Sequence, residues 1–378
     1  MGTAVVLGCA VVPRLRNAAS LCACVGLGVL LLTACGPVGR PDAVPPQETR
    51  RATTLAGTAA AGALPVPHGD GSHVPADFNG DGHRDLVLDD LVKAAGARHD
   101  DDAGIGVVYG TAGGSLTPAV RQLLTARENA AAVGGTLPSA FDSAAACDLD
   151  DDGFSDLVVA TDPPYDGIGR PPVPLQLLFG SPAGLTGRAV VLQIPEGARY
   201  GNEWPDHPVC GDFDGDGSED LAVTASGGRI SFLRGPFTRA GAPRAAGTPF
   251  QGGGPVLTAP APETDVDGDG RDDLVRSARP LAPGSGARGK LLLGGPDGPR
   301  RPGGAYTFEA VDTPAAPPLP PGGSTPVTEV LEYADFDGDG RPDIVTRTHR
   351  GESADAIALY PDGRSQPEVT FSTSVFLG

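Results

Sequence analysis

The stretch that decides the fold is Asp335-Phe-Asp-Gly-Asp-Gly-Arg-Pro-Asp343-Ile, with aspartate at positions 1, 3, 5 and 9 and glycine at position 6. The chain of 378 residues contains five such loops. The other four are Asp77-Phe-Asn-Gly-Asp-Gly-His-Arg-Asp85-Leu, Asp148-Leu-Asp-Asp-Asp-Gly-Phe-Ser-Asp156-Leu, Asp212-Phe-Asp-Gly-Asp-Gly-Ser-Glu-Asp220-Leu and Asp265-Val-Asp-Gly-Asp-Gly-Arg-Asp-Asp273-Leu. Their first aspartates are 71, 64, 53 and 70 residues apart. The chain is therefore built largely from one repeated unit.

Short apolar runs bounded by Gly, Pro, Asp or Ser surround each loop, and such runs are typical of strands. A β-branched run follows the loop, as in Asp156-Leu-Val-Val-Ala, and a second ends in a glycine turn, as in Leu177-Leu-Phe-Gly-Ser. A third run follows, as in Ala189-Val-Val-Leu-Gln-Ile. Together with the run before the loop they give four strands, which make one blade of a β-propeller.

Five loops predict an all-β propeller of five four-stranded blades over residues 65–378. We expect His73 to Phe78 to supply the innermost strand of the first blade, and Glu368 to Phe376 the outermost strand of the last. The alternative is an open array completed by another chain, because unpaired terminal blades would expose apolar surface.

The composition is acidic, with 47 Asp+Glu against 28 Lys+Arg and a formal net charge of −19. Nucleic acid is a poor partner for such a chain, because phosphate binding needs a basic surface. The 56 Gly and 39 Pro follow no strict Gly-X-Y period, which excludes collagen. An apolar content of 40% is sufficient for a core. The Ala, Gly, Pro and Arg bias is typical of a GC-rich genome such as that of an actinobacterium.

The five loops, together with turns such as Phe179-Gly-Ser-Pro-Ala-Gly, resemble the FG-GAP repeat, also called VCBS, of integrin-alpha-like propellers. The resemblance covers residues 65–378. It implies a β-propeller with a calcium ion in the loop that joins the first and second strands of each blade. Integrin-like propellers usually have seven blades, so the five predicted here depart from the pattern.

The chemistry of the loops favours calcium. Carboxylates at positions 1, 3, 5 and 9 and the carbonyl of residue 7 can converge on one hard cation, and oxygen ligands in a flexible loop suit Ca²⁺ better than Mg²⁺. We predict about five structural calcium ions, the first site being weaker because Asn79 replaces a carboxylate. Loops without metal would bring like charges together at high cost. The predicted ligands are Asp77, Asn79, Asp81, His83, Asp85, Asp148, Asp150, Asp152, Phe154, Asp156, Asp212, Asp214, Asp216, Ser218, Asp220, Asp265, Asp267, Asp269, Arg271, Asp273, Asp335, Asp337, Asp339, Arg341 and Asp343.

An EF-hand is excluded because it needs a bidentate glutamate at position 12. The residues at that position are Leu88, Val159, Val223, Arg276 and Thr346.

The N-terminus has the features of an export signal. Arg14 and Arg16 precede an apolar run from Ala18 to Leu32, which is too short for a stable membrane span. The run ends in Leu32-Thr-Ala-Cys35-Gly, which resembles the lipobox of bacterial lipoproteins. We predict a signal peptide over 1–34, lipidation of Cys35, a flexible tether over 35–64, and a location on the outer face of the cell membrane. The alternatives are an ordinary cleaved signal and a membrane anchor.

Cys147 and Cys210 are the cysteines of the mature domain, and they precede their aspartate loops by one and two residues. Strand side chains alternate between faces, so this offset directs the two thiols toward facing sides of adjacent blades. We predict a disulfide between the second and third blades, since an exported protein folds in an oxidising compartment. Two buried free thiols are the alternative.

No Gly-x-Ser-x-Gly elbow, zincin histidine motif or P-loop is present. We therefore predict a monomeric, non-catalytic module that binds a protein or glycan. Its candidate ligand-binding residues lie in loops outside the repeat pattern and are Tyr165, Tyr200, Glu203 and Trp204. The alternatives are a carbohydrate-active enzyme, which needs a carboxylate pair in the central channel apart from the aspartate loops, and a structural scaffold of the cell envelope.

Overall fold

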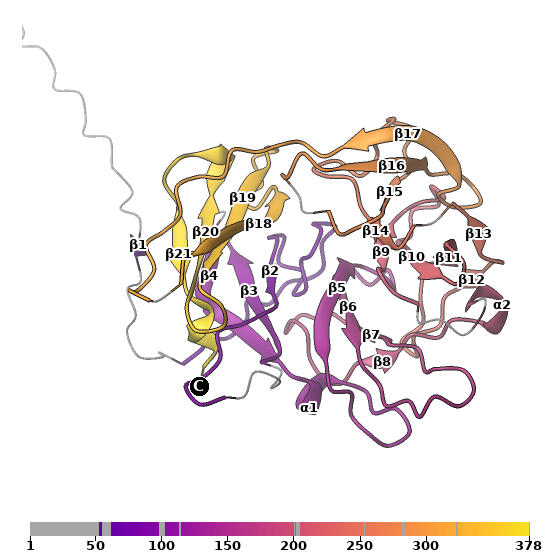
Figure 1. The fold of residues 1–378 in the computed structure, drawn as a ribbon, viewed down its shortest axis with the longest axis horizontal. Coiled ribbons are helices and arrows are strands. Elements are labelled where there is room, and N and C mark those ends of the chain that lie inside the picture. The colour runs from indigo at the N-terminus through magenta and orange to yellow at the C-terminus, as the bar shows by residue number, and fades with distance from the viewer. Residues whose placement is uncertain are drawn as a thin grey trace, which may run out of the picture. The chain divides into compact units, whose positions relative to one another are not determined.

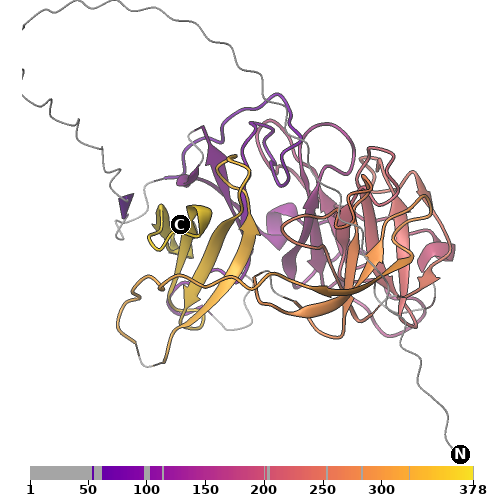
Figure 2. The ribbon, with the colours of Figure 1, turned by 90° about the horizontal axis from the view of Figure 1, so that it is seen from above.

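The computed structural model describes residues 53–54, 62–97, 103–112, 115–199, 201, 205–252, 254–281, 284–322 and 324–377, all within one compact unit. Five sheets succeed one another around a centre, and Figures 1 and 2 show this β-propeller from two directions. The predicted fold class and blade number are confirmed. No helix among these described residues is both long and apolar enough to span a membrane.

The strands of each blade pair antiparallel in chain order, except that in the third blade β12 and β13 both pair with β11. The first blade contains β2 (Leu86–Leu88), β3 (Ile105–Thr111) and β4 (Ser115–Leu124). The second contains β5 (Phe141–Cys147), β6 (Asp156–Thr161), β7 (Leu175–Leu178) and β8 (Val190–Val191). The third contains β9 (Val209–Gly211), β10 (Asp220–Ala225), β11 (Arg229–Arg234), β12 (Ala245–Ala246) and β13 (Phe250–Gln251).

The fourth blade contains β14 (Val256–Thr258), β15 (Leu274–Ser277), β16 (Arg288–Leu293) and β17 (Arg301–Thr307). The fifth contains β18 (Val327–Ala334), β19 (Asp343–His349), β20 (Asp355–Tyr360) and β21 (Val369–Phe371), and β1 (Thr53–Thr54) pairs with it in parallel. The short helices are α1 (Ala126–Asn129), α2 (Glu196–Arg199), η1 (Pro361–Gly363) and η2 (Thr373–Phe376).

The middle strands of the blades are apolar on both faces because neighbouring blades cover them. Every residue of β7 and β20 is buried, for example. Continuous apolar clusters join the first blade to the second, the second to the third and the third to the fourth. The core thus consists of layers between blades, which explains why the sequence shows apolar runs rather than strict alternation.

The first and last blades meet within this one chain. Leu86 and Val108 of the first blade share a cluster with Val345 and Ile357 of the fifth. The predicted outermost strand of the fifth blade is β21, and η2 follows it. The N–H of Val92 donates to Thr373 Oγ1 of η2 at 2.8 Å, which fixes the C-terminal end of the unit to the first blade.

The prediction of an innermost strand at His73 to Phe78 is wrong, because these residues form turns. Pro75 has no N–H to donate, and Ala76 has a positive φ of 57°, so the segment cannot extend. One bond of the missing ladder remains, from the N–H of Asp85 to the carbonyl of Ala76 at 3.0 Å. The first sheet accordingly has three described strands.

Cys147 and Cys210 form a disulfide, with 6.2 Å between their Cα atoms. Cys147 ends β5 and Cys210 lies in β9, so the bond joins the innermost strands of the second and third blades. This is the pairing predicted from the sequence.

We predict that replacing both cysteines by serine lowers the free energy of unfolding by roughly 2–4 kcal/mol, because the bond closes a long loop in the unfolded chain. Denaturant unfolding of the oxidised protein and of the Cys147→Ser/Cys210→Ser variant measures the difference. A reducing agent should destabilise the wild type and leave the variant unchanged. Equal stabilities of the two proteins would contradict the prediction.

Candidate metal centre

In the second to fifth blades the aspartate loops lie between the first and second strands, as predicted. Residues 148–155 connect β5 to β6, and the loops at 212–219 and 335–342 connect the corresponding strands of the third and fifth blades. In the fourth blade the loop precedes β15, and in the first it precedes β2. The repeat therefore places five loops at equivalent points of the propeller.

The aspartate at position 1 folds each loop back on itself. Oδ1 of Asp148 accepts the N–H of Asp152 at 3.1 Å, and Oδ2 accepts the N–H of Gly153 at 2.8 Å. The glycine at position 6 has a φ of 82–89° in all five loops, a conformation that favours glycine. In the other four loops the N–H of this glycine donates in the same way to the carboxylates of Asp77, Asp212, Asp265 and Asp335.

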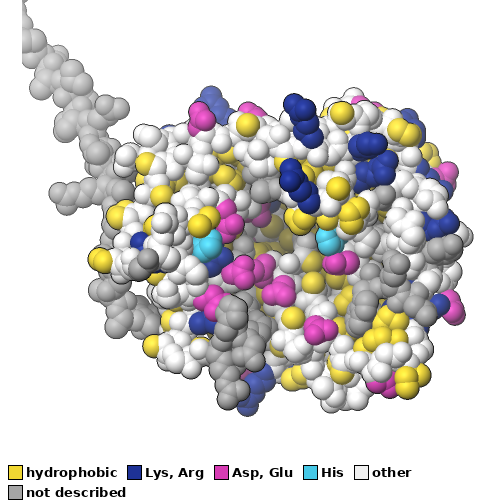
Figure 3. Space-filling model, in the orientation of Figure 1, with side chains coloured by type: hydrophobic (Ala, Val, Ile, Leu, Met, Phe, Trp, Pro, Cys, Tyr) yellow, Lys and Arg dark blue, Asp and Glu magenta, His cyan; other side chains and the backbone are white. Residues whose placement is uncertain are grey.

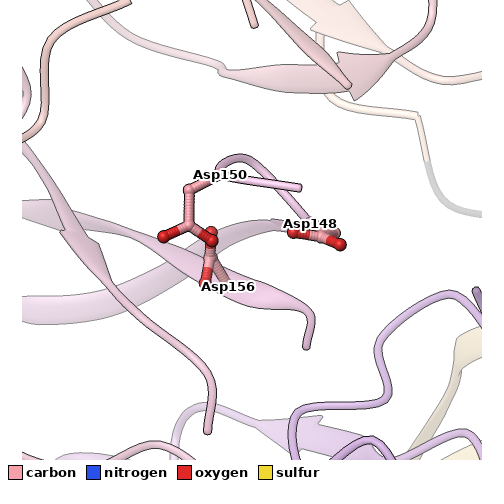
Figure 4. A group of neighbouring side chains, drawn as sticks. All are labelled: Asp148, Asp150 and Asp156. Carbon is pink, nitrogen blue, oxygen red and sulfur yellow. The ribbon is translucent and has the colours of Figure 1, made fainter. Parts of the chain in front are cut away.

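Four loops bring three carboxylates together. Within each group, one oxygen of every carboxylate lies within 4.8 Å of the others. Figure 4 shows the group of the second blade, in which the carboxylates of Asp150 and Asp156 lie side by side. The groups are Asp148, Asp150 and Asp156; Asp212, Asp214 and Asp220; Asp265, Asp267 and Asp269; and Asp335, Asp337 and Asp339. Each of these groups could hold a metal ion.

The side-chain oxygens at position 3 of the loops independently indicate that a metal ion could bind there. Oδ1 of Asp150, of Asp214 and of Asn79 are buried without a hydrogen-bond partner. The side chains of Asp150 and Asp214 are only 7% and 4% exposed. A buried acceptor without a partner loses the free energy of its hydration. A cation in the loop would supply the missing interaction at this position.

The first loop differs from the others. Asn79 Nδ2 donates to Asp81 Oδ2 at 3.0 Å and to the carbonyl of Pro67 at 2.9 Å, so an amide occupies space between the side chains. Its carboxylates form none of the groups within the described residues. The prediction that this is the weakest site stays a prediction.

The aspartate at position 9, predicted as a ligand, also accepts hydrogen bonds that hold the blade together. Oδ1 of Asp156 accepts the N–H of Gly180, just after β7, and Oδ2 accepts the N–H of Leu149 at position 2, at 2.9 and 3.0 Å. The bond to the end of the third strand recurs at Asp85, Asp220, Asp273 and Asp343. In the fourth and fifth blades, position 9 lies outside the carboxylate group and position 5 takes its place. Sequence reasoning missed this role of position 9.

A sequence signal for this role existed in the glycine that recurs at the end of the third strand or just after it. A Cβ built on Gly180 would lie 2.3 Å from the carbonyl oxygen of Ser155, at position 8. The same close approach occurs at Gly110, Gly235 and Gly294. Glycine is required there because the position 9 bond draws the turn against the loop.

The residues at position 7 were predicted to contribute carbonyl oxygens. Their N–H groups donate to the position 5 carboxylate in four loops, as the N–H of Phe154 does to Asp152 Oδ1 at 3.2 Å. The equivalent donors are His83, Ser218 and Arg341. Coordination by the carbonyls at position 7 stays a prediction.

Burial strongly affects ionisation in these groups. It raises the pKa of Asp156 and of Asp220 to about 8, with neighbouring aspartates adding to the effect. Burial, followed by the charge of Asp152, raises the pKa of Asp150 to about 6, although Arg239 acts in the opposite direction. The loops are therefore poorly suited to full ionisation without a bound cation.

The centre of the propeller holds a cavity of about 910 Å³. Position 8 of four loops lines it, through Arg84, Ser155, Glu219 and Asp272. Glu219 and Glu332 are carboxylates of this cavity that belong to no carboxylate group, and Glu332 lies 3.8 Å from Arg84. Figure 3 shows Asp and Glu side chains gathered around the centre of one face, with most Lys and Arg farther out.

Tyr165, a predicted ligand-binding residue, lies in the loop between β6 and β7 and is 39% exposed. Ile168 in the same loop is 79% exposed, and sequence reasoning missed it, although an isolated isoleucine among Gly, Pro and Asp was visible. Tyr165 Oη donates to the carbonyl of Gly169 at 2.7 Å, which closes the tip of the loop. The predicted sites at Cys35, Tyr200, Glu203 and Trp204, and the signal peptide at 1–34, lie outside the described residues.

A scan of the chain against protein-family models finds no match, and a search of curated proteins finds none either.

We predict that the metal-free protein loses stability as pH rises from about 4 to about 8. Asp150, Asp156 and Asp220 have folded-state pKa values of about 6, 8 and 8, above the ordinary value near 4. The native state therefore binds more protons than the unfolded state, and the stability from this uptake is present below pH 4 and is lost as pH passes the folded pKa values. The slope should approach about 1.4 kcal/mol per pH unit for each carboxylate that is still protonated.

Denaturant unfolding of protein freed of metal on a chelating resin, measured across this pH range, tests the prediction. Asp156→Asn, which mimics the protonated side chain, should reduce the slope. Stability that stays level or increases with pH would show that these carboxylates are ionised in the metal-free fold.

Proposed function

We propose that this protein is a calcium-stabilised propeller of the FG-GAP type, held outside the cell membrane by a lipid on Cys35, which binds a protein or glycan without catalysing a reaction. The observation that supports the calcium part best is the buried, unpartnered Oδ1 of Asp150 and of Asp214, each within a group of three carboxylates. Carboxylates at this density need a compensating charge.

Calcium suits these loops for chemical reasons. The side-chain donors are all oxygens, and the loops are short segments between strands that can adjust to a large ion with irregular coordination. Asp148, Asp150 and Asp156 would hold the ion of the second blade. When bound, the ion supplies positive charge that lets these carboxylates stay ionised inside the protein.

We predict that millimolar calcium raises the melting temperature of chelator-treated protein by at least several degrees, because a ligand bound only by the native state stabilises it. Asp214→Asn should reduce the gain, since it removes one charge from the group of the third blade. Asp312→Asn, in an exposed segment away from the loops, is the matched control. An unchanged melting temperature, or an equal effect of magnesium, would overturn the assignment of calcium.

The ligand surface that we propose is the long loop between β6 and β7, residues 162–174. It is held against α2 by an ion pair between Arg170 and Glu196 at 2.9 Å and by hydrogen bonds from Arg199 to the carbonyls of Pro171 and Pro172. An exposed isoleucine and tyrosine on an anchored loop bury apolar area at low entropic cost, which favours binding. Tyr200, Glu203 and Trp204 directly follow α2 in the sequence.

We predict that Ile168→Ser weakens ligand binding at least tenfold, as expected for an apolar anchor of an interface. Glycan arrays and pull-downs of surface proteins identify the ligand, and a titration compares the variants. Val327→Ser is the control, because Val327 is also exposed, at 55%, but lies at the start of β18. Trp204→Ala should act in the same direction as Ile168→Ser. Binding that neither substitution weakens would place the ligand elsewhere.

The carbohydrate-active alternative is supported by one observation, the presence in the central cavity of carboxylates outside the carboxylate groups, namely Asp151, Glu219, Glu263, Asp272 and Glu332. Two carboxylates of this kind are what glycoside cleavage requires. Product release in the same glycan screen, abolished by Glu219→Gln, would favour this alternative over simple binding.

The anchor rests on the lipobox-like sequence at Cys35 and on the export signal before it. A lipid on Cys35 would hold the propeller at the membrane through residues 36–64. Membrane fractionation of a Cys35→Ser variant tests this part, and unchanged partitioning with the membrane would refute it.

A further inference from the structure

Arginines approach three of the five loops, and they do so unequally. Arg239 contacts Asp150 and Asp152 of the second blade. In the third blade Arg244 contacts Asp216, and Arg234 lies 3.3 Å from Asp214. In the fourth blade the contacts are longer: Arg271 lies 3.2 Å from Asp269, and Arg301 lies 3.4 Å from Asp267 and 3.8 Å from Asp269. In the fifth blade Arg341 pairs with Asp362 instead. No arginine of the described residues contacts the carboxylate group Asp335, Asp337 and Asp339.

The carboxylate groups of the second and third blades also differ in their residues from those of the fourth and fifth blades. Asp152 and Asp216, the position 5 residues held closely by arginine, lie outside the groups of the second and third blades. The position 5 residues Asp269 and Asp339 belong to the groups of the fourth and fifth blades. A close arginine thus coincides with a position 5 carboxylate that lies outside the group of three.

Packing of the third blade holds Arg239 at the loop of the second blade. It follows Phe237, whose ring is buried between the second and third blades and whose N–H donates to the carbonyl of Leu149. Its guanidinium also lies over the ring of Phe179, 4.6 Å from the ring centre. The charge is therefore held at the loop of the second blade by packing as well as by the ion pairs.

We propose that Arg239 and Arg244 are internal counter-cations that compete with the metal ion, so that the propeller has two classes of site. The loops of the second and third blades bind the ion weakly, because the arginine holds the position 5 carboxylate. The loops of the fourth and fifth blades bind it tightly, because their position 5 carboxylates already belong to the group. This inference rests on the proposed calcium binding and goes beyond it by ranking the sites.

The magnitude follows from Coulomb's law. A unit positive charge about 6 Å from a divalent ion, even at the dielectric constant of water, opposes binding by roughly tenfold in affinity. Removing that charge also frees a carboxylate ligand. In the metal-free protein the same change has the opposite consequence, because Asp150 and Asp152 then repel each other without compensation.

The decisive experiment compares Arg239→Gln with the wild type by calorimetric calcium titration and by thermal melts with and without chelator. Arg127→Gln is the matched control, because Arg127 lies on the exposed side of α1, away from the loops. We expect Arg239→Gln to melt at a lower temperature than the wild type in chelator. With calcium we expect a larger stabilisation than the wild type shows, and one site at least tenfold tighter.

A purely structural role of Arg239 would lower both melting temperatures alike and leave calcium affinity unchanged, which would overturn the proposal. A single class of wild-type sites would also overturn it. Absence of calcium binding by the wild type would instead refute the proposed function. The melt in chelator measures stability without metal, so a failure of the ranking of sites can be distinguished from a failure of the proposed calcium binding.

Discussion

Each blade depends on one buried carboxylate, the aspartate at position 9 of its loop. These five side chains are 0–2% exposed, and each accepts an N–H from the end of the third strand of the blade or from the turn after it. The sequence distance bridged by the bond ranges from 15 residues in the third blade to 25 in the first. The bond fixes one end of the blade and leaves the connection at the other end free to vary in length. The long loop that carries Tyr165 and Ile168 lies at that variable end.

The aspartates of the loops also give the acidity of the chain a structural explanation. A formal net charge of −19 does not require a basic partner, because many of the aspartates are gathered in the five loops, where their charges interact within the protein. Burial raises the pKa of Asp156 and Asp220, so the fold must supply either protons or positive charge to these sites. Arginines from the chain supply part of the positive charge at the loops of the second, third and fourth blades, and a metal ion would supply the rest.

Local patterns in the sequence predicted most of the fold. The repeat of aspartates and glycine predicted five blades, and the one-residue difference in the offsets of Cys147 and Cys210 predicted their disulfide. The first blade was predicted incorrectly because Pro75 and the positive φ of Ala76 override a weak apolar run. The arginine partners were not predictable, since Arg239 lies 87 residues from Asp152 and only the packing of Phe237 between two blades brings it there. Ile168 stands out in the sequence as an isolated isoleucine, but the exposure of its side chain becomes clear only in the fold.

The layers between blades are not equally strong, and this bears on where a metal ion matters most. Clusters of several buried apolar residues from both blades join four of the five neighbouring pairs. Between the fourth and fifth blades the apolar contact is smaller: Val311, whose N–H donates to the carbonyl of Gly284 in the fourth blade, packs against Ile344, Ala358 and Tyr360 of the fifth. The connection there is the proline-rich segment 312–322, which Tyr360 Oη holds through the carbonyl of Ala315 at 3.1 Å. The fifth blade closes the ring against the first, and its carboxylate group is the one without an arginine. An ion in this loop would therefore stabilise the blade on which ring closure depends, where the chain itself offers no substitute charge.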